Sequence, residues 1–114
     1  RIVGLVGVVT AGRPLMVILE YCEHGALDKY LAKTELSDKD KHMIAGDCAE
    51  GLAYLANRNF VHRDVAARNV LVGSERRAKI SDFGLSRDTS QSAYYRSKGG
   101  QVCCCLACAI LLLC

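Results

Sequence analysis

The sequence lacks the features that mark several other classes of protein. It has 114 residues but no tryptophan and a single proline, Pro14. The formal net charge is only +3, and a polar turn accounts for the one basic cluster, at positions 76–79, so a nucleic-acid-binding surface is not indicated. His24 and His42 have no partners at the spacing of a metal site. No amino-terminal signal peptide is visible, which favours a reducing, cytosolic environment.

The cysteines are distributed unevenly along the chain. Cys22 and Cys48 stand alone in otherwise periodic segments, where a small buried hydrophobic residue is expected. The other five of the seven lie in the segment 102–114 (VCCCLACAILLLC), which has no charged or turn-forming residue. This tail falls short of the ~20 residues that span a bilayer as a helix. Its cysteines could be palmitoylated, or it could be a truncated or mistranslated end, which is the interpretation we prefer.

The first twenty residues predict a β-hairpin. Residues 2–10 (IVGLVGVVT) are rich in β-branched residues, and residues 15–20 (LMVILE) form the continuous apolar run typical of a well-buried strand. Gly12 and Pro14 between them favour a turn. The chain begins at Arg1 without an initiator methionine, so we expect a cut inside a larger sequence.

Helices are predicted in the middle of the chain. A short helix is expected over residues 26–33, and Ser37 is a good cap for a longer one that ends near Ala56. Apolar residues recur at helical spacing along this second helix, at Ile44, Ala45, Cys48, Leu52 and Leu55. Short apolar segments separated by polar loops follow, which indicates a site assembled on loops against a helical scaffold.

Three oxygen-bearing side chains in those loops suit phosphoryl transfer. Asp64 and Asn69 lie five residues apart in one loop, and Asp82 follows the apolar segment 79–81. Transfer of a phosphoryl group from ATP needs hard oxygen ligands for Mg²⁺ and a carboxylate that orients the attacking hydroxyl. Taken singly, Asp64 is better interpreted as a turn aspartate and Asn69 as a cap or a bridge to the backbone, so the prediction depends on the joint pattern.

The surrounding motifs resemble those of a known family. Residues 62–69 (HRDVAARN) resemble the catalytic loop of protein tyrosine kinases, and residues 82–84 (DFG) resemble the metal-binding motif that follows it. The Ala-Ala-Arg within the first motif is similar to the tyrosine-specific form. Residues 19–22 (LEYC) with Gly25 resemble the hinge that binds adenine, and residues 82–101 resemble an activation loop.

This resemblance implies roles for individual residues. Asp64 would be the catalytic base for a substrate tyrosine, and Arg68 would help to place the substrate ring and balance the charge of Asp64. Asn69 and Asp82 would hold Mg²⁺ against the phosphates of ATP. At the hinge, the backbone groups of Glu20 and Cys22 would hydrogen-bond adenine, and Leu19 would be the gatekeeper residue. Leu71 would lie beneath the adenine base. The resemblance also implies that His62 packs on Phe83, and that Tyr94 and Tyr95 are autophosphorylation sites whose phosphates could pair with Arg63.

The resemblance predicts an α+β fold, namely part of a protein-kinase fold with a remnant of the N-lobe sheet and the first part of the helical C-lobe. Residues 1–20 would be N-lobe strands, 21–25 the hinge, 26–101 the C-lobe with the catalytic and activation loops, and 102–114 an atypical tail. The glycine-rich loop, the strand lysine and its glutamate partner of the family are absent, as is the downstream segment with proline and tryptophan.

Two functional interpretations therefore remain. The first is ATP-dependent phosphorylation of protein tyrosine by the parent kinase, with ATP, Mg²⁺ and tyrosine-containing proteins as its partners. The second is a truncated, inactive fragment that acts as a binding module or has no function. Either would lie on the cytoplasmic side, in the cytosol or as the intracellular part of a membrane receptor, with membrane association through that receptor or through the cysteine-rich tail.

Overall fold

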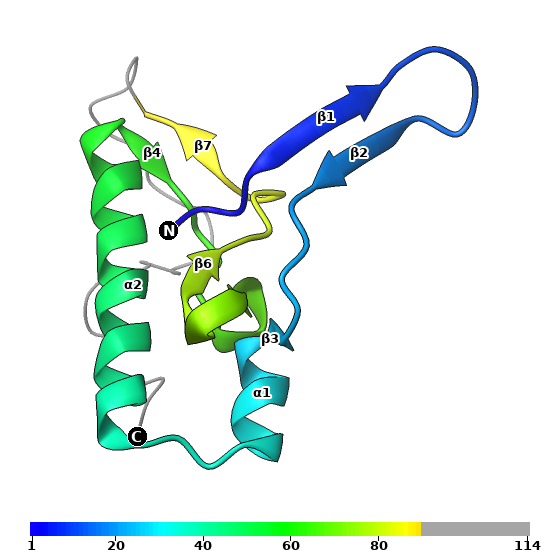
Figure 1. Cartoon of the computed structure of the whole chain (residues 1–114). Coiled ribbons are helices and arrows are strands. Elements are labelled where there is room, and N and C mark those ends of the chain that lie inside the picture. The colour runs from blue at the N-terminus through cyan, green and yellow to red at the C-terminus, as the bar shows by residue number, and fades with distance from the viewer. Residues whose placement is uncertain (90–114) are drawn as a thin grey trace.

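A β-hairpin that projects from the rest of the molecule begins the chain (Figure 1). The computed structural model describes residues 1–89; Tyr94, Tyr95 and the tail 102–114 lie outside the described residues. Strand β1 (Leu5–Val9) pairs antiparallel with β2 (Met16–Leu19). The hairpin predicted from the turn residues is therefore confirmed.

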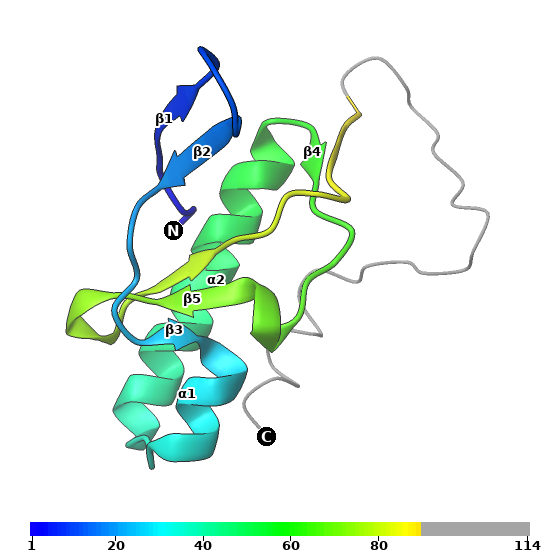
Figure 2. The same cartoon turned by 90° about the vertical axis from the view of Figure 1, so that its right-hand side faces the viewer.

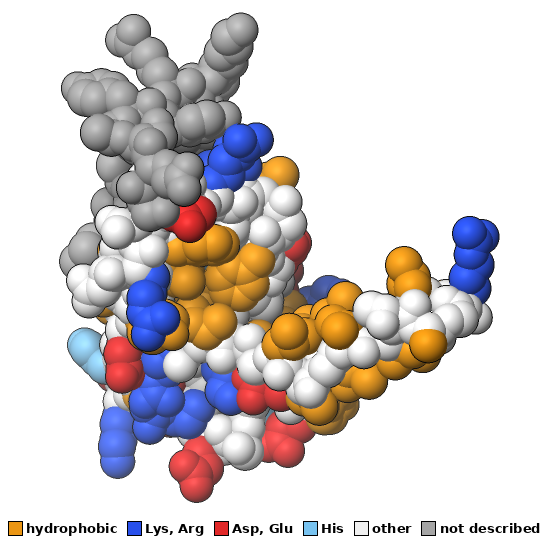
Figure 3. Space-filling view, turned by 90° about the horizontal axis from the view of Figure 1, so that it is seen from above, with side chains coloured by type: hydrophobic (Ala, Val, Ile, Leu, Met, Phe, Trp, Pro, Cys, Tyr) orange, Lys and Arg blue, Asp and Glu red, His pale blue; other side chains and the backbone are white. Residues whose placement is uncertain are grey.

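The predicted burial of the second strand is wrong. All four residues of β2 are exposed, and the apolar side chains of both strands cover the surface of the projecting arm (Figure 3). An apolar run shows only that a strand can be buried, not that a partner covers it. Within residues 1–89 the hairpin contacts the other described elements mainly at its base. The exposed hydrophobic residues here are Leu5, Val6, Val8, Leu15, Met16, Val17, Ile18 and Leu19.

The core lies between the long helix α2 (Asp38–Asn57) and a three-stranded antiparallel sheet of order β3-β5-β6 (Figures 1 and 2). The sheet strands are β3 (Gly25–Ala26), β5 (Val70–Val72) and β6 (Ala78–Ile80). The apolar face of α2 predicted from helical spacing is buried, and it packs with the inward-facing residues of β5 and β6. The buried members of this core are Leu27, Leu36, Ile44, Cys48, Leu52, Val70, Val72, Ala78 and Ile80.

Both predicted helices are confirmed with nearly the expected bounds. The short helix α1 (Leu27–Lys33) follows β3 directly, and α2 begins after Ser37, whose Oγ accepts a hydrogen bond from the Asp40 amide at 3.2 Å. Neither helix in the described part of the chain combines the length and the hydropathy that crossing a membrane requires. Cys22 and Cys48 are buried free cysteines, as expected for small core residues.

Short elements connect the core to the loops that follow. The 3₁₀ turns η1 (Ala67–Asn69) and η2 (Ser74–Arg76) flank β5, and β4 (Phe60–Val61) pairs antiparallel with β7 (Arg87–Asp88). This last pairing ties the end of the described chain to the segment that leaves α2. The mixture of helices and small antiparallel sheets confirms the predicted α+β class.

The segment before β1 is held against α2 and β6. Ile2 bridges Ile80, the Val3 amide donates to the Ile80 carbonyl at 2.9 Å, and the Ile80 amide donates to the Arg1 carbonyl at 2.8 Å. Gly51 of α2 makes this approach possible, since a Cβ there would lie 2.8 Å from the Arg1 carbonyl oxygen. Close packing at this glycine sets the position of the hairpin relative to the core.

Candidate functional site

The carboxylate of Asp64 is held by two neighbours in its own loop. Asn69 Nδ2 donates to Asp64 Oδ2 at 2.8 Å, and Arg68 donates to Asp64 Oδ1 at 2.6 Å. The hydrogen bond from Asn69, followed by that from Arg68 and its positive charge, keeps the pKa of Asp64 below its ordinary value despite some desolvation. Asp64 is therefore ionised at neutral pH, with about a quarter of its side chain exposed (23%).

The amide of Asn69 is oriented by this arrangement. Besides the bond to the Asp64 carboxylate, Asn69 Nδ2 donates to the Asp64 backbone carbonyl at 2.9 Å. Because the nitrogen side of the amide is occupied by Asp64, the oxygen Oδ1 is the atom left to take up a cation. Asn69 is otherwise buried, so its backbone is fixed by the core around η1 and β5.

Asp82 comes from the end of β6 and is exposed. Its backbone has a φ of 59°, in the left-handed region that costs energy for a residue with a side chain. The Gly84 amide donates to Asp82 Oδ1 at 3.3 Å, which closes a tight turn at this point. Strain of this kind is concentrated at functional sites, where surrounding contacts maintain it.

The loops of Asp64 and Asp82 are joined through His62. Its ring lies 5.1 Å from that of Phe83 between centroids, so the packing expected from the family resemblance is present. His62 Nδ1 accepts from the Asp64 amide at 3.3 Å, which leaves Nε2–H to donate to the Ser81 carbonyl at 2.9 Å. The buried ring therefore links the two loops through its neutral Nε2–H tautomer.

The residues suggested as a hinge begin at the last residue of β2, Leu19. The Glu20 side chain accepts from Lys79 Nζ at 2.8 and 2.7 Å and from the Gly4 amide at 2.9 Å. The side chain is therefore engaged within the protein. The Glu20 amide also donates to the Gly4 carbonyl at 2.9 Å, so the backbone carbonyl of Glu20 is the group that remains for a ligand. Cys22 is buried, and this burial raises the pKa of its thiol. Leu19 is exposed and Leu71 is half-buried.

Three ion pairs were not predicted from the sequence, where the basic cluster at 76–79 was attributed to a polar turn. Arg77 donates to both carboxylate oxygens of Asp47, at 2.9 and 2.7 Å, and Asp47 is almost fully buried (3% exposed). Lys79 pairs with Glu20, as described above, and Arg76 pairs with Asp40. These partners lie 30 to 59 residues apart in the sequence, and no local spacing signals such pairs.

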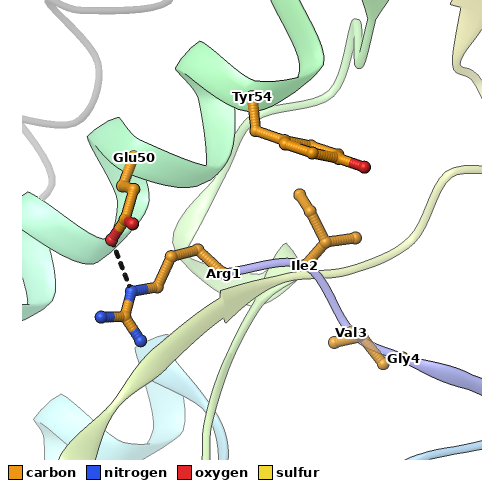
Figure 4. A pocket seen from close by; sticks show the side chains of 6 residues that line it. All are labelled: Arg1, Ile2, Val3, Gly4, Glu50 and Tyr54. Atoms are coloured by element: carbon orange, nitrogen blue, oxygen red, sulfur yellow. Dashed lines mark hydrogen bonds and ion pairs between the residues drawn. The ribbon is translucent and has the colours of Figure 1, made fainter. Parts of the chain in front are cut away.

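A cavity of about 340 Å³ lies beside the amino-terminal segment (Figure 4). Arg1 on one side donates to Glu50 at 2.8 Å, and Tyr54 of the same helix lies across from Ile2. None of the predicted site residues lines it; its lining consists of Arg1, Ile2, Val3, Gly4, Glu50 and Tyr54.

The candidate metal ligands are few. Within residues 1–89, no group of three or more His, Cys, Asp and Glu side chains is placed to hold a metal ion. A single carboxylate and a single amide nevertheless fit Mg²⁺, which commonly takes one or two protein carboxylates and completes its shell with water and substrate phosphates. Asp82 and Asn69 provide ligands of that type.

Comparison with known proteins gives consistent matches over most of the chain. Residues 1–110 match the model of a family described as protein tyrosine and serine/threonine kinase. Chicken (Gallus gallus) ephrin type-B receptor 1 is 46% identical over 108 residues, and a molluscan insulin-related peptide receptor of Lymnaea stagnalis is 45% identical over 112 residues. These matches cover 90% and 89% of this chain but only 11% and 7% of the respective receptors, so the chain spans about a tenth of their length.

Proposed function

Because the chain belongs to the protein tyrosine and serine/threonine kinase family, we propose that it contributes the catalytic centre of an enzyme that transfers the γ-phosphoryl group of ATP to tyrosine in protein substrates. The observation that carries this proposal is the Asp64 carboxylate, ionised and held by Asn69 and Arg68. We retain the division of residues 1–101 into N-lobe strands, hinge and C-lobe as part of the proposal.

Asp64 is assigned the role of base. An ionised carboxylate can accept the proton of a tyrosine hydroxyl as that oxygen attacks phosphorus. Although the Asp64 carboxylate accepts two hydrogen bonds, it is still partly exposed, so a substrate hydroxyl can approach it. Arg68 is more exposed than Asp64 and is assigned to the substrate ring.

Asn69 and Asp82 are assigned to Mg²⁺. Mg²⁺ would neutralise charge on the phosphates and hold them in place. Two observations support this role. The contacts with Asp64 use Nδ2 of Asn69 and leave Oδ1 to bind a cation, and Asp82 is exposed beside a tight turn. Leu19, Leu71 and the backbones of Glu20 and Cys22 are assigned to the adenine ring on the family resemblance.

Regulation by Tyr94 and Tyr95 extends the same proposal beyond the described residues. A phosphate adds about two negative charges and can order a loop by pairing with arginine, for which Arg63 is the assigned partner. The cytoplasmic side is the proposed location, either in the cytosol or as the intracellular part of a receptor.

The experiment that tests the base uses residues 1–101 in place of the matching segment of an active tyrosine kinase. Asp64→Asn should lower kcat for a tyrosine peptide by at least about a hundredfold, since a base contributes 10² to 10⁴. The matched control is Asp38→Asn, which changes an exposed carboxylate in the first turn of α2 and should leave kcat unchanged. Undiminished activity of the Asp64 variant would reject the assignment.

One observation favours a second candidate, a non-catalytic binding module. Leu19 and Tyr21, on either side of Glu20, are 53% and 89% exposed, so the described residues bury little of the adenine side of the hinge. If this alternative holds, ATP with Mg²⁺ will not raise the melting temperature of the 114-residue chain. A clear, saturable rise would favour the nucleotide-binding interpretation.

A further inference from the structure

Four residues around the candidate catalytic centre form a closed circuit of hydrogen bonds. Asp64 accepts from Asn69, the Asn69 carbonyl accepts from Ser81, the Ser81 carbonyl accepts from His62, and His62 accepts from the Asp64 amide. Each link is between 2.8 and 3.3 Å long. The circuit connects the loop of the proposed base to the strand that delivers Asp82.

Ser81, like His62, belongs to this circuit without a role in the proposed reaction. It is 9% exposed, and it donates twice to the same carbonyl of Asn69, from its amide at 2.8 Å and from Oγ at 2.9 Å. The pairing of β5 with β6 ends at Val70 opposite Ile80, so Asn69 and Ser81 are the next residues beyond the ladder. The hydroxyl therefore adds a second donor where regular pairing stops.

This second donor has a geometric consequence. The peptide group that carries the Asn69 carbonyl is held on its other side by the Val70 amide, which donates to the Ala67 carbonyl. The Ser81 hydroxyl, which reaches the Asn69 oxygen from the side chain, adds a third hydrogen bond that restricts the tilt of this peptide group. Because Asn69 and Asp82 lie directly beside this junction in the two segments, the hydroxyl limits how the two proposed ligands move relative to each other.

We infer that Ser81 is a positioning residue for the divalent cation, acting through Asn69. This inference depends on the proposed function, since it takes Asn69 and Asp82 as the ligands. Mg²⁺ demands near-ideal octahedral geometry, so a small shift of one ligand lowers affinity. Partners that orient metal ligands typically change affinity by about 10- to 100-fold when they are removed.

The test uses the full chain, labelled with ¹⁵N, and Mn²⁺ with ATP as a paramagnetic substitute for Mg²⁺. In the unaltered chain the backbone amide signals of Asn69 and Asp82 should broaden together as Mn²⁺ is added. Ser81→Ala should raise the Mn²⁺ concentration that gives half-broadening by about tenfold. Ser81→Thr, which keeps the hydroxyl, should restore at least part of the affinity.

Ser86→Ala is the matched control. The Ser86 hydroxyl donates to the His62 carbonyl at 3.2 Å, so the variant also removes one hydroxyl bond to the catalytic loop, but not one to Asn69. Half-broadening should stay at the Mn²⁺ concentration of the unaltered chain. If Ser86→Ala and Ser81→Ala raised the Mn²⁺ concentration for half-broadening equally, Ser81 would only stabilise the loop in general, and the inference would be overturned.

The possible failures are distinguishable. If the unaltered chain shows no broadening at Asn69 or Asp82, the proposed metal site is wrong and the inference is wrong with it. If the unaltered chain broadens and Ser81→Ala matches it, only the inference is overturned. If circular dichroism shows that Ser81→Ala is unfolded, Ser81→Cys takes its place, and a half-broadening concentration equal to that of the unaltered chain would then refute the role of the hydroxyl.

Discussion

Lys79 Nζ donates to both carboxylate oxygens of Glu20, at 2.8 and 2.7 Å, and so ties the segment after the hairpin to β6. The two residues lie 59 positions apart in the sequence. The same carboxylate accepts from the Gly4 amide at 2.9 Å, which adds the segment before β1. One acidic side chain thus joins three segments at the base of the hairpin.

This contact predicts a dependence of stability on pH. The hydrogen bond from Lys79, and then that from the Gly4 amide, lower the pKa of Glu20 in the folded chain. A carboxyl whose folded pKa is depressed contributes stability that is present above its unfolded pKa and is lost as the pH falls through the folded value. The free energy of unfolding should therefore decrease as the pH falls through about 4.5, where an unfolded glutamate is half-protonated, and down to the lowered pKa of folded Glu20.

Glu20→Gln should remove part of this dependence and lower stability at pH 7 by about 1 kcal/mol, as expected for the loss of charge-assisted hydrogen bonds at a partly exposed site. Urea unfolding at pH 7 and pH 3.5 measures both effects. Glu35→Gln, in the loop between the helices, is the control for a change of charge alone. Identical pH profiles for Glu20→Gln and the unaltered chain would contradict the prediction.

Two glycines on one helix should respond in opposite directions to alanine. A Cβ at Gly51 would lie 2.8 Å from the Arg1 carbonyl oxygen and 3.0 Å from Ile80 Cγ1, so the amino-terminal segment would have to move. Nothing lies within 4 Å of a Cβ built at Gly46. Gly46→Ala should therefore stabilise the chain by about 0.5 to 1 kcal/mol through helix propensity, whereas Gly51→Ala should destabilise it by about 1 to 3 kcal/mol through overpacking.

Thermal and urea unfolding of both glycine variants would test this prediction. If Gly51→Ala were as stable as Gly46→Ala, the close approach of the amino-terminal segment to α2 would be wrong. The Arg1 carbonyl accepts from the Ile80 amide, so loosening that segment should also increase hydrogen exchange at Ile80.

Asp47 is predicted to be the most sensitive charged residue of the core. It is 3% exposed and accepts from Arg77 twice and from the Ala78 amide at 3.0 Å. Asp47→Ala would leave Arg77 and a buried amide without these bonds, which should cost about 3 kcal/mol or more in urea unfolding. Asp38→Ala, at an exposed position on the same helix, should cost less than about 1 kcal/mol. A loss below about 1 kcal/mol for Asp47→Ala would contradict its role in joining α2 to β6.

The sequence predicted the elements whose signals are local. The cap at Ser37, the apolar spacing along α2 and the turn before Pro14 each require only neighbouring residues, and all three match the structure. The motifs 62–69 and 82–84 likewise identified the candidate site, and the packing of His62 on Phe83 followed from the resemblance. These features could be predicted because a few adjacent positions determine them.

Other features depend on contacts across the chain and could not be predicted. The apolar run of β2 was expected to be buried, yet burial requires a packing partner that the run itself does not specify. The pairs Glu20–Lys79 and Asp47–Arg77 join distant segments. The hydrogen bond from the Ser81 hydroxyl to the Asn69 carbonyl could not be predicted either, because it depends on where the pairing of β5 with β6 ends.

The ionisation of Asp64 provides a test of the catalytic loop that needs no activity. The hydrogen bond from Asn69, then the bond and charge of Arg68, lower the pKa of the Asp64 carboxyl. Removing either donor should raise this pKa, because the hydrogen bond from Asn69 and the hydrogen bond and charge of Arg68 all lower it. Titration of the carboxyl ¹³C signal of Asp64 in the full chain measures the pKa directly.

Arg58→Gln is the control for this titration. The guanidinium of Arg58 lies 4.9 Å from the centroid of the Tyr54 ring on α2, and its removal should leave the titration of Asp64 unchanged. If Arg68→Gln and Asn69→Ala both titrated like the unaltered chain, the carboxylate would not be held as described, and the argument for Asp64 as an ionised base would fail.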